Sequence, residues 1–177
     1  MAKYPSLNSK YMMILWLLLI LFAVVGFEYI SVRKERSRPV LTAGQRFPSI
    51  NVFSSSGKEE SFDDRLRKNM VLVVFSTSCI HCLDEMRFWN EYSSSVDDSV
   101  EVNALSTDDQ ESTAAFVKGH HISFPVFTSV SSTVTDTLHV RSVPMVIFID
   151  RKKVVRRVIF GNQMKNNVNR HLVEFLQ

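Results

Sequence analysis

The chain has two cysteines, and they stand together in the tetrapeptide Cys79-Ile80-His81-Cys82. An apolar run over 70–75 precedes this pair and a helical pattern follows it, so Cys79 is expected where a helix begins. A helix N-terminus carries about half a positive charge and stabilises a thiolate. Two intervening residues leave the second sulfur close enough to attack a mixed disulfide on the first. The spacing therefore predicts reversible dithiol–disulfide exchange, with Cys79 attacking and Cys82 resolving.

Other uses of a cysteine pair fit this sequence poorly. Covalent haem attachment requires Cys-x-x-Cys-His, but Leu83 follows Cys82. A structural zinc site has four ligands, and the chain offers no second cysteine pair, only scattered histidines such as His120 and His121. A disulfide that closes so short a loop restricts the unfolded chain little, so a purely structural bridge is a weak explanation. We expect no metal site and no organic cofactor.

The composition suits one globular domain and an accessory segment. The chain has 177 residues, of which 45% are hydrophobic and 22% charged, which argues against disorder. Residues 1–40 hold six of the 21 Lys and Arg but two of the 18 Asp and Glu, leaving 15 basic and 16 acidic residues over 41–177. The main domain therefore lacks the net basic charge expected of a nucleic-acid binder, and we expect no nucleic-acid partner.

The N-terminal segment predicts a membrane anchor. Residues 11–27 contain no charge and span about 25 Å as a helix; continuing to Val32 reaches the roughly 30 Å of a hydrocarbon core. A cleavable signal peptide is the competing interpretation, but this run is longer than usual and residues 24–28 lack a small-x-small cleavage site. The expected organisation is a flank at 1–10, an anchor at 11–32, a linker at 33–42 and a domain at 43–177.

The orientation of this anchor is predicted differently by charge and by chemistry. Two lysines precede the apolar run, whereas the basic residues that follow it are Arg33, Lys34, Arg36, Arg38 and Arg46. The positive-inside rule thus favours a cytoplasmic domain. Disulfide chemistry instead favours an oxidising compartment, and a chain with no further cysteines avoids mispairing there. We expect an extracytoplasmic domain, and the conflict stays open.

The main domain alternates strands with helices, as a layered α/β domain does. Six consecutive apolar residues over 70–75 predict a central strand buried on both faces. Apolar residues at helical spacing predict an amphipathic helix over 80–94, with Trp89 in the core. Further strands are expected at 50–54, 60–62, 100–105, 143–149 and 154–160, and further helices at 107–118 and 162–176.

Several segments carry a family resemblance. The matching segments are Ala43–Pro48, the turn Ser56-Gly57-Lys58, the strand and cysteine pair followed by Glu85, Phe124-Pro125-Val126, and Val143-Pro144 with the apolar strand to Asp150. This pattern resembles the thioredoxin superfamily, specifically membrane-anchored TlpA/ResA-like thiol–disulfide oxidoreductases, over about residues 41–165. The resemblance implies a thioredoxin-like fold, with a central mixed sheet flanked by helices. Ser78 and Met86 depart from it, standing where the family commonly has Trp and Pro.

The resemblance also implies roles for residues around the pair. The Val143-Pro144 peptide bond would be cis and lie beside the disulfide, presenting the Val143 backbone to an extended polypeptide substrate. Glu85 would take the proton of Cys82. The dipeptide Ile80-His81 would tune the reduction potential, because a protonated histidine stabilises the thiolate and makes the pair more oxidising.

The direction of transfer is predicted in two ways. His81 resembles the residue of an oxidising DsbA-type pair, whereas the rest of the domain implies a reductase, and we follow the latter. The implied partners are cysteine-containing exported proteins, including apocytochromes, and a membrane electron donor of thiol type. Two alternatives remain: a thiol peroxidase, for which Ser76 is suitably placed but the wider motif is absent, and a copper-binding assembly factor, whose Cys-x-x-x-Cys spacing is one residue longer.

Overall fold

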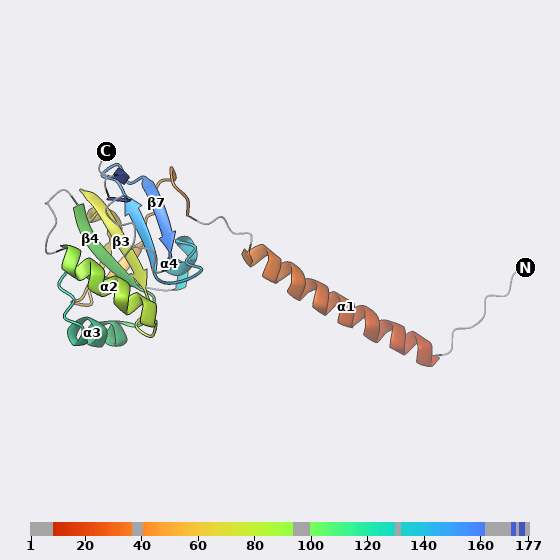
Figure 1. Cartoon of the computed structure of the whole chain (residues 1–177). Helices are drawn as coiled ribbons and strands as arrows, with labels where there is room; N and C mark the ends of the chain where they lie inside the picture. Colours follow the sequence, from red (N-terminus) through yellow and green to blue (C-terminus); the bar gives the residue numbers. More distant parts are fainter. Residues whose placement is uncertain are drawn as a thin grey trace, which may run out of the picture. The chain divides into compact units, whose positions relative to one another are not determined.

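The computed structural model describes residues 9–36, 41–93, 100–129, 132–161, 171–172 and 174–175. The chain divides into two compact units, Met1–Pro39 and Val40–Gln177, and each is described by itself. The first unit contains a single long helix, and the second contains the sheet (Figure 1). The cysteine pair belongs to the second unit.

Helix α1 (Ser9–Arg36) carries the predicted anchor and extends beyond it at both ends. Its segment Tyr11–Ser31 is 21 residues long, has a mean hydropathy of 2.5 and contains an apolar stretch of which no residue is buried. A helix that is apolar on every face requires an apolar surrounding. Among the helices of the described residues, α1 is the one long and apolar enough to cross a membrane.

The second unit is built on a seven-stranded mixed sheet in the order β2-β1-β5-β4-β3-β6-β7. The strands are β1 (Asn51–Phe53), β2 (Glu59–Ser61), β3 (Asn69–Phe75), β4 (Val100–Ser106), β5 (Val126–Ser129), β6 (Met145–Ile149) and β7 (Val155–Phe160). Strands β3, β4 and β5 run parallel, and the other neighbouring pairs are antiparallel. This architecture confirms the predicted thioredoxin-like α/β fold.

Helices cover both faces of the sheet (Figure 1). They are α2 (Ile80–Ser93), α3 (Gln110–Gly119) and α4 (Ser132–Thr137), and a short 3₁₀ turn, η1 (Phe62–Asp64), precedes β3. The sequence did not predict α4, because its Ser- and Thr-rich sequence has low helix propensity. Its position is fixed by tertiary burial of Val134 and of Leu138, which follows the helix. Most of the helix expected at 162–176 lies outside the described residues.

Strand β3 is the centre of the domain and supports the cysteine pair. It pairs with β4 on one side and β6 on the other, so that Val73 lies between Ala104 and Val146. Every side chain from Met70 to Phe75 is fully buried. This confirms the predicted strand with two buried faces, and the carboxyl end of that strand lies directly before the turn that leads to Cys79.

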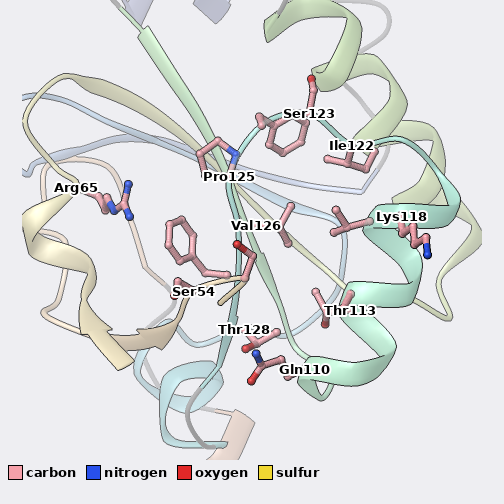
Figure 2. A pocket seen from close by; sticks show the side chains of 15 residues that line it. Ser54, Arg65, Gln110, Thr113, Lys118, Ile122, Ser123, Pro125, Val126 and Thr128 are labelled. Atoms are coloured by element: carbon pink, nitrogen blue, oxygen red, sulfur yellow. The ribbon is translucent and has the colours of Figure 1, made fainter. Parts of the chain in front are cut away.

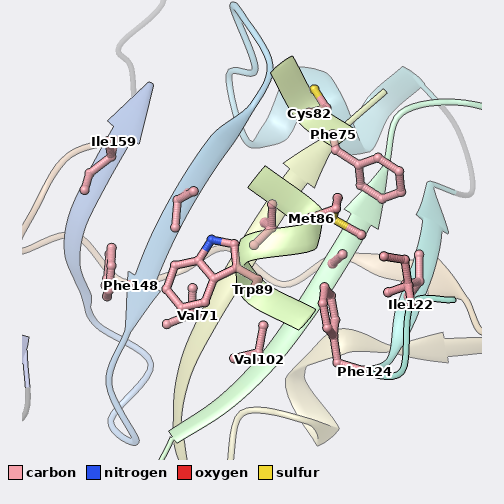
Figure 3. Close-up of a cluster of buried hydrophobic side chains, with 14 of the residues drawn as sticks. Val71, Phe75, Cys82, Met86, Trp89, Val102, Ile122, Phe124, Phe148 and Ile159 are labelled. Carbon is pink, nitrogen blue, oxygen red and sulfur yellow. The ribbon is translucent and has the colours of Figure 1, made fainter. Parts of the chain in front are cut away.

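The core beneath α2 fixes this helix on the sheet (Figure 3). Trp89 and Met86 are fully buried there beside Val71, and the Trp89 ring meets the Phe148 ring edge-on at 6.4 Å. The prediction that Trp89 is a core residue is confirmed. Because Cys82 belongs to the same buried cluster, packing of the helix also sets the position of the second sulfur.

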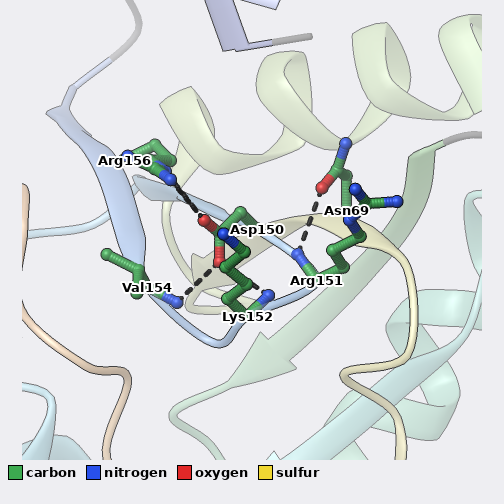
Figure 4. Close-up of polar contacts among 6 residues, drawn as sticks. All are labelled: Asn69, Asp150, Arg151, Lys152, Val154 and Arg156. Atoms are coloured by element: carbon green, nitrogen blue, oxygen red, sulfur yellow. Dashed lines mark hydrogen bonds and ion pairs between the residues drawn. The ribbon is translucent and has the colours of Figure 1, made fainter. Parts of the chain in front are cut away.

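The turn between β6 and β7 is held by the carboxylate of Asp150 (Figure 4). Its oxygens accept hydrogen bonds from the backbone of Lys152 (2.8 Å) and Val154 (2.9 Å) and from Arg156 Nε (2.8 Å). Burial raises the pKa of Asp150, but these hydrogen bonds outweigh it and hold the pKa below its usual value. The turn lacks glycine, and Lys153 takes the left-handed conformation at φ 63°. Asp150 thus stabilises a turn of unfavourable backbone geometry.

Replacing Asp150 by alanine is expected to lower the free energy of unfolding by about 1–3 kcal/mol, because two part-buried backbone N–H groups and an arginine lose their acceptor. Asp64→Ala, at an exposed position, is the matched control and should change it by less than about 0.5 kcal/mol. Urea unfolding measures both. Because the pKa of Asp150 is lowered, the difference should persist above pH 4 and diminish as the carboxylate is protonated at lower pH. Equal stabilities for the two variants would contradict this role.

Candidate functional site

Cys79 occupies the N-cap position of α2. Its carbonyl accepts hydrogen bonds from the backbone N–H of Cys82 at 3.0 Å and of Leu83 at 3.3 Å. Its Sγ also accepts from the N–H of Cys82, at 3.3 Å. The sulfur therefore takes the place of the side-chain oxygen that ordinarily caps a helix. A negative charge on this sulfur faces the N–H of Cys82 and the positive end of the helix dipole.

The two sulfurs differ in accessibility. Both cysteines are free thiols; Cys79 is half-buried and Cys82 is fully buried. Between them, Ile80 is 70% exposed and His81 is exposed. A visiting protein can therefore reach the sulfur of Cys79 but not that of Cys82.

The environment of Cys82 keeps its thiol protonated. Burial raises the pKa of Cys82 to about 12, and the neighbouring Cys79 thiol and the charge of Glu85 act in the same direction. A hydrogen bond with the backbone of Ser76 opposes them only in part. Ionisation of Cys82 at neutral pH thus requires a group that accepts its proton.

Glu85 is buried on the same face of α2 as Cys82, with 1% of its surface exposed. The indole Nε1 of Trp89 donates a hydrogen bond to its Oε1 at 2.9 Å. Sequence reasoning placed Trp89 in the core but missed this contact. The four-residue spacing of the two side chains on one helix was the available signal.

The Val143-Pro144 peptide bond is cis, as the resemblance implied. The thiol of Cys79 points at the carbonyl oxygen of Val143, with 3.8 Å between sulfur and oxygen. Pro144 is buried and Val143 half-buried, and β6 begins at the next residue. The structure thus brings together two segments 64 residues apart in the sequence, Cys79 and the backbone of Val143.

Sequence reasoning also missed Asp108, which it placed only within the helix expected over 107–118. The carboxylate of Asp108 accepts hydrogen bonds from Ser76 and Thr77, which lie three and two residues before Cys79. Its neighbour Asp109 is the residue that caps α3, through a bond of 2.8 Å from the N–H of Ser112. Local sequence alone gives no signal that separates these two adjacent acids.

A groove of about 530 Å³ runs along β5 and α3 (Figure 2), and neither cysteine is among the residues that line it. Its floor includes Val126 and Phe127, and Gln110 and Thr113 of α3 form one wall. In the described part of the chain, no group of three or more His, Cys, Asp or Glu side chains is arranged to hold a metal ion.

The chain matches known proteins over most of its length. Residues 43–158 match the model of the AhpC/TSA family. The chain is 30% identical over 159 residues to a thiol-disulfide oxidoreductase ResA of Bacillus cereus, in a match that covers 88% of this chain and 91% of that one. It is 26% identical to ResA of Geobacillus kaustophilus, with coverage of 88% and 90%.

Solved structures of thiol–disulfide proteins share the fold of this chain. A structure of Chlorobium tepidum, named as a thiol:disulfide interchange protein DsbE, superposes with a TM-score of 0.70 at 16% identity, covering 77% of this chain and 99% of that chain. At this identity the likeness concerns the fold. Together with the sequence matches and the accessible sulfur at a helix start, it leads to one assignment: the chain belongs to the AhpC/TSA family and, within it, to the thioredoxin-like thiol–disulfide oxidoreductases related to ResA.

Proposed function

We propose that this protein reduces disulfides of exported proteins on the extracytoplasmic side of a membrane, with α1 as its anchor. The observation that carries the proposal is the asymmetry of the pair: an accessible Cys79 sulfur at a helix start, 3.8 Å from the Val143 carbonyl, and a buried Cys82 behind it. An extended substrate lying along Val143 and Pro144 would place its own sulfur next to Cys79.

The proposed reaction has two steps. The Cys79 thiolate attacks one sulfur of a substrate disulfide, a new S–S bond forms, and the released substrate thiolate takes up a proton. The thiol of Cys82 then loses its proton and attacks the sulfur of Cys79, which releases the second substrate thiolate and leaves an internal Cys79–Cys82 disulfide. The substrate gains two electrons and two protons, and the protein loses them. A membrane-bound dithiol donor would restore the reduced pair.

Glu85 is the proposed proton acceptor for Cys82. Its carboxylate is buried on the face of α2 that carries this thiol, and its charge acts on the pKa of Cys82. Ile80 and His81, exposed between the two cysteines, are the proposed residues that tune the reduction potential.

Replacing Glu85 by glutamine should slow the second step about 100-fold, because the amide keeps the shape but does not accept the proton. Stopped-flow measurement of mixed-disulfide decay separates this step from the first attack, which should change little. Asp84→Asn, at the neighbouring and only half-buried carboxylate, is the matched control. Unchanged decay in Glu85→Gln would show that Glu85 is not the proton acceptor.

The direction and the orientation have separate tests. The redox state of the pair is trapped in cells by acid and alkylation; a mainly reduced pair supports the reductase, and a mainly oxidised pair identifies an oxidase.

The orientation of the domain is tested in the Cys79→Ser, Cys82→Ser double variant carrying Glu111→Cys, an exposed position. Labelling of intact cells by an impermeant maleimide places the domain outside, and labelling only after lysis places it in the cytoplasm.

A further inference from the structure

The turn before the cysteine pair is held by one carboxylate. Asp108 Oδ2 accepts hydrogen bonds from the Thr77 N–H at 2.5 Å, from Thr77 Oγ1 at 2.7 Å and from Ser76 Oγ at 3.1 Å. Hydrogen bonds accepted by a carboxylate are shorter and stronger than those between neutral groups. A single side chain thus fixes both residues that connect β3 to the segment Ser78-Cys79.

Asp108 is itself fixed by the sheet. Its backbone N–H donates to Ser106 Oγ at 3.1 Å, and Thr113 Oγ1 of α3 donates to the same buried oxygen at 2.8 Å. Thr107, the residue before Asp108, donates a hydrogen bond from its backbone N–H to the Phe75 carbonyl at 2.9 Å. The segment after β4 and the segment after β3 are therefore joined at two successive points, which gives the carboxylate a defined position.

This arrangement extends to the attacking sulfur through the backbone. The N–H of Cys79 donates to the Ser76 carbonyl at 3.2 Å, and Ser76 Oγ lies 3.0 Å from Ser78 Oγ. Ser78 is exposed and therefore packs little surface against the domain. Polar contacts to Asp108 thus hold this turn. A large side chain in the place of Ser78 could instead hold it by burying apolar surface.

We propose that Asp108 is a positioning residue for the oxidoreductase reaction: by holding Ser76 and Thr77, its carboxylate keeps the sulfur of Cys79 at the first N–H groups of α2 and against the Val143 carbonyl. This inference rests on the proposed role of Cys79 as the attacking thiol. According to this proposal, the sulfur is aligned by the acceptor oxygen of Asp108 and not by its negative charge.

Three substitutions in the full-length chain separate alignment from general stability. Asp108→Ala removes the acceptor, Asp108→Asn keeps an acceptor oxygen but removes the charge, and Asp109→Ala removes only the cap of α3. The readouts are the pH at half-maximal alkylation of Cys79 in the reduced protein, the equilibrium reduction potential and the melting temperature. None of these depends on the identity of a substrate or on the direction of transfer.

Asp108→Ala should slow alkylation of Cys79 about tenfold at pH 7, raise the pH at half-maximal alkylation and shift the potential to a more reducing value, because the thiolate loses its N–H donor. Asp108→Asn should restore most of the wild-type alkylation behaviour and most of the wild-type reduction potential. Asp109→Ala should lower the melting temperature without moving the alkylation midpoint or the reduction potential. Thr77→Val, which removes one donor, should cause a smaller shift of the same sign and serves if Asp108→Ala does not fold.

Two results would overturn the inference. One is an unchanged alkylation midpoint in folded Asp108→Ala or in Thr77→Val. The other is an equal shift in Asp108→Ala and Asp108→Asn, which would assign the effect to charge. If the wild-type protein fails to reduce a protein disulfide while the alkylation contrast holds, the proposed function fails and the positioning role of Asp108 stands.

Discussion

Replacing Cys79 by serine should abolish disulfide reduction, with turnover falling about a thousandfold or more, because Cys82, the other of the chain's two cysteines, is fully buried. Cys82→Ser should stop the reaction one step later. Cys79 would still attack, but the mixed disulfide would have no neighbouring thiol to release it. Insulin reduction measures turnover, and non-reducing electrophoresis detects the trapped adduct.

The matched control for both variants is Ser78→Ala, at the exposed position next to the pair. It should retain reductase activity within about threefold, since it removes a single exposed hydroxyl contact. Normal turnover in Cys79→Ser, or a stable adduct in Cys79→Ser but not in Cys82→Ser, would reverse or remove the assigned roles. Consumption of hydrogen peroxide through a sulfenic acid on Cys79 would instead favour the peroxidase alternative.

The reduced protein should be alkylated almost only at Cys79 when treated at pH 7. Burial raises the pKa of Cys82 from 9.0 to about 12, which lowers its thiolate population about a thousandfold, and none of its surface is exposed. Iodoacetamide labelling followed by peptide mass spectrometry measures the two rates separately. Similar rates for the two cysteines would contradict the buried environment of Cys82.

The same pKa predicts how stability changes in alkali. The unfolded chain ionises Cys82 near pH 9, whereas the folded chain keeps it neutral until about pH 12. Its contribution to stability is therefore complete below pH 9 and decreases as the pH rises toward 12. Urea unfolding of reduced wild-type protein should show this loss, and Cys82→Ala should show a smaller decrease. Parallel curves for the two proteins would contradict the raised pKa.

Local sequence was sufficient for the elements that carry the pair. An unbroken apolar run predicted β3, which is buried on both faces, and helical spacing predicted α2 with Trp89 inside. Each pattern reports the burial of its own element, and burial is the dominant favourable contribution to folding. The same reasoning missed α4, because short Ser- and Thr-rich segments become helical only where the core accepts their few apolar side chains.

The contacts that shape the site could not be predicted from local sequence patterns. The hydrogen bond from Thr77 to Asp108 joins residues 31 apart, and Cys79 meets Val143 across 64 residues. The resemblance to a family implied the second contact; nothing implied the first. Asp108 and Asp109 are chemically identical neighbours, and only the path of the chain after β4 turns one toward the cysteines and the other toward α3.

The sequence by itself therefore determined the chemistry of this protein: two cysteines with two residues between them at a helix start, and an apolar segment able to cross a membrane. Tertiary structure alone decided how much of each cysteine is exposed, how far the pKa of Cys82 rises, and that Asp108 lies beside the turn before the pair. The physical reason is the distance along the chain over which each effect acts. Residue type and periodicity act within one element, whereas accessibility and proton affinity depend on every element packed around the sulfur.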